Sequence, residues 1–194
     1  MMHPREVIFV DLEASSLTEG YPIEVGWAIV RDFKVTTESH LIRPTPEWYF
    51  DDFRWSTDSQ AVHRITRGNL LDHGKLPTEV ATRMTELFSG KTLYSDAPSY
   101  DFAWTVELFH AAFKDRSAVP FKLADVSSLY EDGGTDERKF EQEVRKRRKF
   151  KVEHRAADDA LNLALMWCHS RRALNASQFE YPPLRESWKI LLDN

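Results

Sequence analysis

Two carboxylates, Asp11 and Glu13, follow an apolar run, and their position and spacing could serve chemistry. Residues 7–10 read Val-Ile-Phe-Val, and a run that is apolar on both faces is typical of a central strand. Side chains alternate along a strand, so residues two positions apart share a face. The two carboxylates therefore point the same way at the strand's carboxyl end, where they repel each other unless cations lie between them. A strand that ends in solvent is the alternative, and the position after a central strand favours a metal-binding pair.

A third carboxylate stands in the middle of the chain. Asp101 follows a short predicted strand at 92–95 and opens a predicted helix at 101–113. An Asp at a helix start is commonly only an N-cap, and Asp96 competes for the same metal-binding role. We favour Asp101 because an aromatic residue, Tyr100, precedes it and the helix that follows has an apolar face.

His154 and Asp159 stand at the start of a long apolar helix predicted at about 157–174. Five residues along a helix turn by about 500°, which would leave these two side chains about 140° apart on a single helix. They converge only if His154 lies in the loop before the helix and Asp159 lies in its first turns. Asp159 shares the apolar stripe of Leu163, whereas Asp158 falls on a more polar side. Asp159 is therefore the predicted inward acid.

The remaining pattern predicts the elements that position these side chains. Strands come first, and strands then alternate with helices, which is typical of an α/β domain with a mixed β-sheet flanked by α-helices. A chain of 194 residues has the length of one domain, so we expect a single domain over 1–194 with its core at about 5–175. Further strands are predicted at about 6–13, 23–30, 36–42 and 121–124, and further helices before His63 and at 77–88, 136–149 and 183–192.

Taken in order, these motifs resemble the DEDDh 3′→5′ exonuclease superfamily, which includes ribonuclease T, oligoribonuclease and the proofreading subunits of replicative polymerases. Residues 9–17 resemble the family's first motif, and residues 154–160 are close to its His-Arg-Ala-x-Asp-Asp-Ala form. Residues 23–26 and 61–66 resemble the second strand and the Val-His-Gly-Ile-Thr segment that lie between them. The resemblance covers nearly the whole chain and implies a ribonuclease H-like fold.

Three positions depart from the family's pattern. Ser15-Ser16 stands where Thr-Gly is common, and Arg64 replaces a usual Gly. Residues 95–101 read Ser-Asp-Ala-Pro-Ser-Tyr-Asp, where the family often shows His-Asn-x-x-Phe-Asp. The last departure leaves Asp96 and Asp101 in competition.

The resemblance implies an enzyme that hydrolyses phosphodiester bonds from nucleic-acid 3′ ends and releases nucleoside 5′-monophosphates. Four carboxylates would hold two Mg²⁺ or Mn²⁺ ions, and His154 would be the general base that takes a proton from water. Hard cations suit oxygen ligands, so zinc is not expected. The implied metal ligands are Asp11, Glu13, Asp101 and Asp159.

Residues just after the first motif contact the terminal nucleotide in family members. This correspondence assigns Ala14, Ser15 and Leu17 to the substrate site. His63 either lines the same pocket or is a buried, hydrogen-bonded turn histidine.

Two further segments allow two readings each. The basic run at 145–149, with Lys151 and Arg155, either contacts phosphates or forms a solvated helix face. The aromatic stretch at 48–55 either packs a long loop or stacks bases of a single strand.

Composition limits the partners. A formal net charge of -5 argues against a protein that coats nucleic acid by bulk electrostatics, and it leaves a local binding site open. The single cysteine, Cys168, excludes an internal disulfide and a Cys-based zinc site, which fits a cytoplasmic location. The sequence has no signal-peptide layout and no apolar stretch of membrane-spanning length.

The expected partner is therefore nucleic acid, RNA or DNA with a single-stranded 3′ end, and no membrane. The predicted last helix either docks on its own domain or forms a homodimer surface. Two rival classes stay open, a non-catalytic nucleic-acid-binding protein of the same fold and a hydrolase of very short oligonucleotides.

Overall fold

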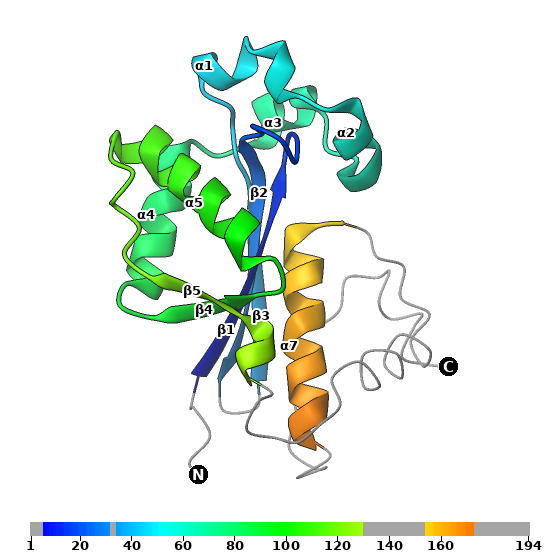
Figure 1. The fold of residues 1–194 in the computed structure, drawn as a ribbon, viewed down its shortest axis with the longest axis vertical. Helices are drawn as coiled ribbons and strands as arrows, with labels where there is room; N and C mark the ends of the chain where they lie inside the picture. Colours follow the sequence, from blue (N-terminus) through cyan, green and yellow to red (C-terminus); the bar gives the residue numbers. More distant parts are fainter. Residues whose placement is uncertain (1–5, 32–33, 130–153, 173–194) are drawn as a thin grey trace.

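Within the described part of the chain, five strands form one mixed sheet in the order β3-β2-β1-β4-β5, and Figure 1 shows how the sheet lies among the helices. The computed structural model describes residues 6–31, 34–129 and 154–172. The strands β1, β2 and β3 form an antiparallel meander, and β4 and β5 continue the sheet in parallel with β1. Their bounds are Glu6–Ala14, Pro22–Arg31, Lys34–Leu41, Thr92–Ser95 and Lys122–Asp125.

β1 is the central strand, as its apolar run predicts. It pairs with β2 on one side and with β4 on the other, and the residues from Val7 to Val10 are all buried. Across the β1–β2 ladder, Asp11 pairs with Gly26 and Glu13 pairs with Glu24. The carboxylate pair thus lies at the carboxyl end of the best-covered strand.

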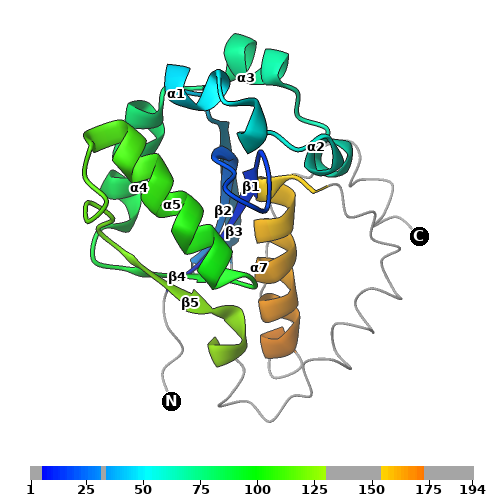
Figure 2. The ribbon, with the colours of Figure 1, turned by 45° about the horizontal axis from the view of Figure 1, so that its top comes forward.

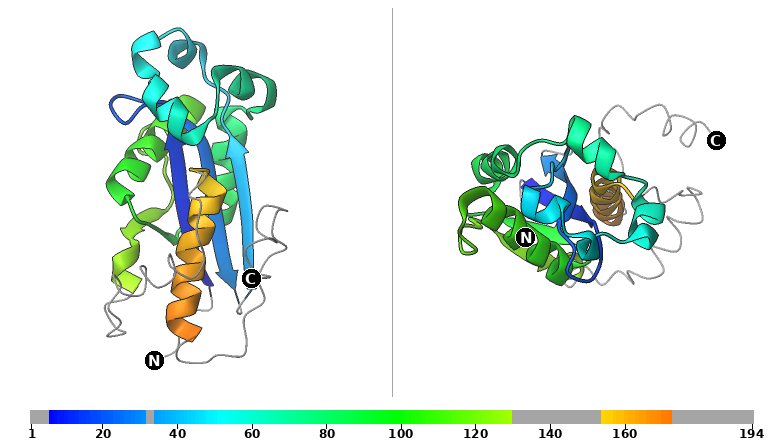
Figure 3. Two further views of the ribbon diagram at one scale, coloured as in Figure 1. Left: turned by 90° about the vertical axis from the view of Figure 1, so that its right-hand side faces the viewer. Right: turned by 90° about the horizontal axis from the view of Figure 1, so that it is seen from above.

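Helices cover the two faces of the sheet. Helices α4 (Pro77–Phe88) and α5 (Pro98–Phe113) pack against one face, and α7 (Ala156–Arg172) packs against the other. This three-layer arrangement is visible from above in Figure 3. Successive side chains of β1 point to opposite faces of the sheet. Val10 belongs to the core under α4 and α5, and Phe9 belongs to the core under α7.

Short helices lie over the end of the sheet where β1 finishes (Figure 2). Each of the four begins at a residue whose side chain accepts a hydrogen bond from a backbone N–H of the first turn, which satisfies a donor the helix itself leaves free. These elements are α1 (Pro46–Tyr49), η1 (Asp52–Arg54), α2 (Thr57–His63) and α3 (Arg67–His73), capped by Thr45, Asp51, Ser56 and Thr66. A further short turn, η2 (Val126–Leu129), follows β5.

The predicted fold class, a mixed sheet flanked by helices, is confirmed. The helix at 77–88 and the strand at 92–95 have the predicted bounds. α5 begins at Pro98, three residues before the predicted start, because proline is accommodated in a first turn where no N–H is needed. The predicted helices at 136–149 and 183–192 lie outside the described residues, and the single-domain assignment stays a prediction. Among the described residues, no helix is both long enough and apolar enough to cross a membrane.

Candidate active site

Acids from β1 and α7 meet at the carboxyl end of β1. Oxygen or nitrogen atoms of Glu13, His154 and Asp159 all lie within 4.8 Å of one another. Glu13 shares the β1 face that α7 covers, so the side chain of Asp159 reaches it from the first turns of the helix. The structure places Asp159 in this group and leaves Asp158 out of it, which agrees with the predicted helix phase.

A second group joins the same end of β1 to α5. Carboxylate oxygens of Asp11, Asp96 and Asp101 lie within 4.8 Å of one another. Asp101 is 1% exposed, and its carboxylate accepts hydrogen bonds from the backbone N–H of Leu12 at 3.2 Å and from the hydroxyl of Ser95. Asp101 is therefore held against both β1 and β4, whereas Asp96 is exposed.

The helix-capping alternative for Asp101 is wrong. The N-cap of α5 is Ala97, and its side chain makes no capping hydrogen bond. Asp101 lies one turn further along, and its carboxylate points toward the sheet. Asp96 and Asp101 both lie beside Asp11, and burial distinguishes the oriented acid from the exposed one.

Mutual repulsion and burial raise the pKa values of the predicted acids. Burial first, and then the charge of Asp159, raises the pKa of Glu13 to about 8. Burial and the charge of Asp96 raise the pKa of Asp101 to about 7, and burial raises that of Asp159 to about 6. Burial and the charge of Asp101 raise the pKa of Asp11 well above its ordinary range. Oxygen ligands crowded in this way fit divalent cations, whose charge would make the ionised forms stable together.

A buried ion pair positions the start of α7. Glu24 is 2% exposed and accepts hydrogen bonds from the guanidinium of Arg155 at 2.9 and 2.7 Å and from the backbone N–H of Ala156 at 3.2 Å. The last bond satisfies one free donor at the helix N-terminus. Sequence reasoning assigned Arg155 to the basic run and did not foresee this pair, although residue 24 lies in a recognised motif opposite Glu13. The rest of that run, 145–149 and Lys151, lies outside the described residues.

Close packing at Gly26 also positions the start of α7 against β2. A Cβ atom at Gly26 would lie 2.2 Å from the backbone nitrogen of Ala157, so only glycine lets the helix backbone approach β2 here. Gly26 is the ladder partner of Asp11. His154, just before the helix, is exposed and has a positive φ of 46°, so it lies in the loop, as convergence with Asp159 requires.

The turn that follows β1 separates buried from exposed residues. Ala14 and Ser15 are buried, and the hydroxyl of Ser15 donates to the carbonyl of Arg54 at 2.6 Å and accepts from the N–H of Tyr21 at 2.9 Å. Leu17 is 70% exposed. Of the three residues assigned to the substrate site, Leu17 is the one whose side chain is free to meet a ligand, and Ser15 holds the turn that presents it.

His63 is a buried histidine at the end of α2, near Glu24 and His154. Its Nδ1 accepts from the N–H of Ile65 at 3.0 Å, and its buried Nε2 has no hydrogen-bond partner among the residues that the structure describes. Burial lowers the pKa of His63 to about 4, against the opposing charge of Glu24. The ring is therefore neutral with its proton on the buried Nε2. Arg64, which stands for a usual glycine, has a φ of 60° at the end of α2, and this left-handed position explains the usual glycine.

The aromatic stretch at 48–55 divides into two kinds of residue. Trp48 is 3% exposed and stacks on Tyr21 with ring centroids 5.2 Å apart, which is the packing reading. Phe50 and Phe53 are 80% and 97% exposed. Among the residues that the structure describes, packing therefore accounts for Trp48 and leaves the side chains of Phe50 and Phe53 largely uncovered.

The architecture described above is a ribonuclease H-like fold. Solved structures of E. coli exonuclease I share it. The zinc-bound form of its complex with single-stranded DNA matches with a TM-score of 0.62 at 14% identity, over 90% of this chain and 42% of that one. The complex with a dT13 oligonucleotide matches with a TM-score of 0.63 at 16% identity, over 87% of this chain and 41% of that one.

These matches confirm the fold that the resemblance to DEDDh exonucleases implies. At such identities the likeness concerns the fold alone, and this chain spans about two fifths of the length of the matched proteins. No protein-family model and no curated protein matches the sequence.

Proposed function

We propose that this chain is a metal-dependent 3′→5′ exonuclease that releases nucleoside 5′-monophosphates. The observation that carries the proposal is the meeting of Asp11, Glu13, Asp101 and Asp159 from three separate elements at one end of β1. The three elements that carry these acids lie far apart in the sequence, and each acid was singled out by the DEDDh pattern. Burying repelling carboxylates costs stability, so their convergence supports a use for the charge.

The four acids would hold two divalent cations. Bound cations supply Lewis acidity at the scissile phosphate and lower the pKa of a bound water. Oxygen ligands favour Mg²⁺ or Mn²⁺. Zinc belongs in the same test, because a zinc-bound form of E. coli exonuclease I has the same fold. The expectation that zinc is not used is therefore left to experiment.

The remaining residues have distinct roles. His154 would take the proton of the attacking water, since neutral imidazole is a base that works near neutral pH. Leu17 would contact the terminal nucleotide, with Ala14 and Ser15 forming the turn beneath it. His63, which is 2% exposed, would support the wall of the same pocket from within the protein. The expected substrate is a single-stranded 3′ end, and the fold shared with complexes of single-stranded DNA supports it.

The test is a degradation assay on matched, labelled RNA and DNA, each single- and double-stranded, with Mg²⁺, Mn²⁺ or Zn²⁺. We expect stepwise shortening from the 3′ end, 5′-monophosphate products, and loss of turnover in Asp11→Asn without a fall in melting temperature. Asp158→Asn is the matched control, because Asp158 lies outside the groups that could hold metal. Normal turnover in a folded Asp11→Asn protein would exclude the assignment.

The same assay separates the rival classes. Activity confined to dinucleotides would indicate a hydrolase of very short oligonucleotides. Binding without turnover under every metal would indicate a non-catalytic nucleic-acid-binding protein.

A further inference from the structure

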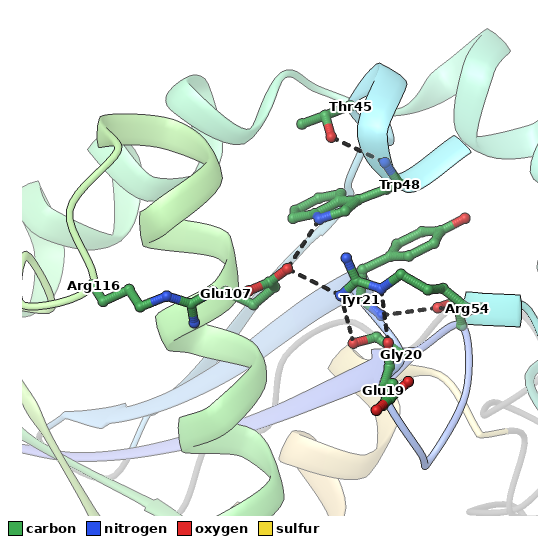
Figure 4. Close-up of polar contacts among 9 residues, drawn as sticks. Glu19, Gly20, Tyr21, Thr45, Trp48, Arg54, Glu107 and Arg116 are labelled. Carbon is green, nitrogen blue, oxygen red and sulfur yellow. Dashed lines mark hydrogen bonds and ion pairs between the residues drawn. The ribbon is translucent and has the colours of Figure 1, made fainter. Parts of the chain in front are cut away.

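A hollow of about 650 Å³ lies beside the turn that carries Leu17, on the outer side of α5. Its volume falls within the range of about 300–1,000 Å³ that is typical of small-molecule sites. The side chains that matter here are Leu17, Arg54, Tyr100, Trp104, Glu107 and Arg116. Figure 4 shows the charged part of this lining.

One wall of the hollow offers aromatic surface. Tyr100 and Trp104 stand one helical turn apart on α5, with ring centroids 5.8 Å apart and planes tilted by 38°. Tyr100 is 55% exposed, so one face of the pair is open to a ligand. Nucleobases stack on such faces with little dependence on sequence.

The hollow is preformed, because hydrogen bonds within the protein hold its walls together. Arg54 donates to Glu107 on α5 at 3.0 Å and to the carbonyl of Glu19 at 2.8 Å, and thus ties the Leu17 turn to the helix. Glu107 also accepts from the indole N–H of Trp48 at 3.1 Å and from Arg116 at 3.3 Å. These bonds join the two walls (Figure 4), and a preformed site loses less entropy on binding.

The hollow adjoins the acids without including them. Tyr100 is the neighbour of Asp101, which points inward from the same helix, and Leu17 follows the acids of β1. Leu17 lines the hollow and is also the exposed residue assigned to the terminal nucleotide. A strand whose last nucleotide lies against Leu17 would bring its next base to this wall.

We propose that this hollow binds the base of the penultimate nucleotide of a single strand, stacked on Tyr100 and Trp104, with Arg116 beside its phosphate. The proposal rests on the proposed exonuclease function. A base that stacks on protein must leave its duplex partner, so the subsite favours unpaired 3′ ends. The side chain of Arg116 is 63% exposed and can reach a phosphate while Glu107 keeps its bond to Arg54.

The first experiment measures binding and needs no turnover. A single-stranded oligonucleotide carries 2-aminopurine at the penultimate position, or at the fifth from the 3′ end, in buffer with EDTA. We expect fluorescence quenching on binding for the penultimate probe only, and loss of most of it in Tyr100→Ala. Phe113→Ala is the control, because Phe113 is an exposed aromatic residue of the same helix and does not line the hollow.

The second experiment measures turnover with Mg²⁺. Stacking of one base corresponds to a loss of roughly 5- to 150-fold on removal of its aromatic partner, and the half-open wall places Tyr100→Ala near the low end, as a rise in KM. A substrate that is abasic at the penultimate position should show the same rise with the native protein and no further rise with Tyr100→Ala.

The outcomes distinguish the two proposals. Two results would overturn the subsite. One is an equal effect of Tyr100→Ala on hydrolysis of the intact and the abasic substrate, and the other is fluorescence quenching of equal size at both probe positions. Absence of hydrolysis on every substrate would overturn the exonuclease, and the fluorescence experiment would still report on the hollow.

Discussion

Removing the charge of Glu24 should destabilise the protein, because it leaves the Arg155 guanidinium without its partner. Breaking a buried ion pair by removing one member costs about 3–5 kcal/mol. Two features reduce that figure here, since the Arg155 side chain is 35% exposed and glutamine keeps one oxygen to accept from Ala156. We therefore expect Glu24→Gln to lower the free energy of unfolding by about 2–3 kcal/mol. For a chain of this length that corresponds to a fall of about 4–12 °C in melting temperature.

The assay is urea and thermal unfolding, with Glu38→Gln as the matched control. Glu38 forms a similar two-bond pair with Arg83 at 3.1 and 3.0 Å, and glutamine keeps an oxygen for the contact with His40 at 2.8 Å. The Arg83 side chain is 44% exposed and that of Glu38 is 32% exposed. An exposed pair contributes about 0–1 kcal/mol. Equal losses in the two variants would refute the reasoning, because burial is the property that separates them.

The remaining predictions concern the acids and the loop histidine. We expect Asp159→Ala to lose Mn²⁺ affinity and activity, Asp158→Ala to keep most of both, and His154→Ala to keep the metal while chemistry slows by about 10²–10⁴-fold; calorimetric titration with single-turnover rates separates these results, and metal loss in Asp158→Ala would contradict the helix phase. The pKa values of Glu13 and Asp101, raised to about 8 and about 7, mean that the metal-free folded protein binds more protons than the unfolded chain at neutral pH. Its unfolding free energy should fall as pH rises from about 4 to about 8, and Mn²⁺ should offset the fall; a melting temperature in EDTA that does not fall over this range would contradict the pKa assignments.

Local patterns predicted the frame of the site well. The run from Val7 to Val10 indicated a buried central strand, and alternation alone placed Asp11 and Glu13 on a shared face. Periodicity also chose Asp159 over Asp158, because the apolar stripe of a helix reports which side faces the sheet. These features depend only on residues that are close together in the sequence, so they can be predicted from the sequence alone.

Contacts between distant residues were not predictable in the same way. Glu24 and Arg155 lie 131 positions apart, and nothing in the local pattern around Arg155 distinguishes a guanidinium that pairs with a buried acid from one that contacts phosphate. Asp101 was expected at the start of its helix, and its buried position arose from a proline start three residues earlier. The hollow beside Leu17 likewise depends on Arg54 and Glu107, which are 53 positions apart.

The contacts that position the start of α7 show why the Glu24–Arg155 ion pair matters to the proposed chemistry. Asp159 reaches Glu13 only if the helix backbone approaches β2 closely, and Gly26 permits that approach without fixing the helix along its axis. The bond from the Ala156 N–H to Glu24 fixes the axial position, three residues before Asp159. Glu24 pairs with Glu13 across the β1–β2 ladder. The acid that positions α7 is therefore next to Glu13, the acid that would share a cation with Asp159. A shift of the helix start would therefore separate Asp159 from Glu13 even when the sheet stays intact.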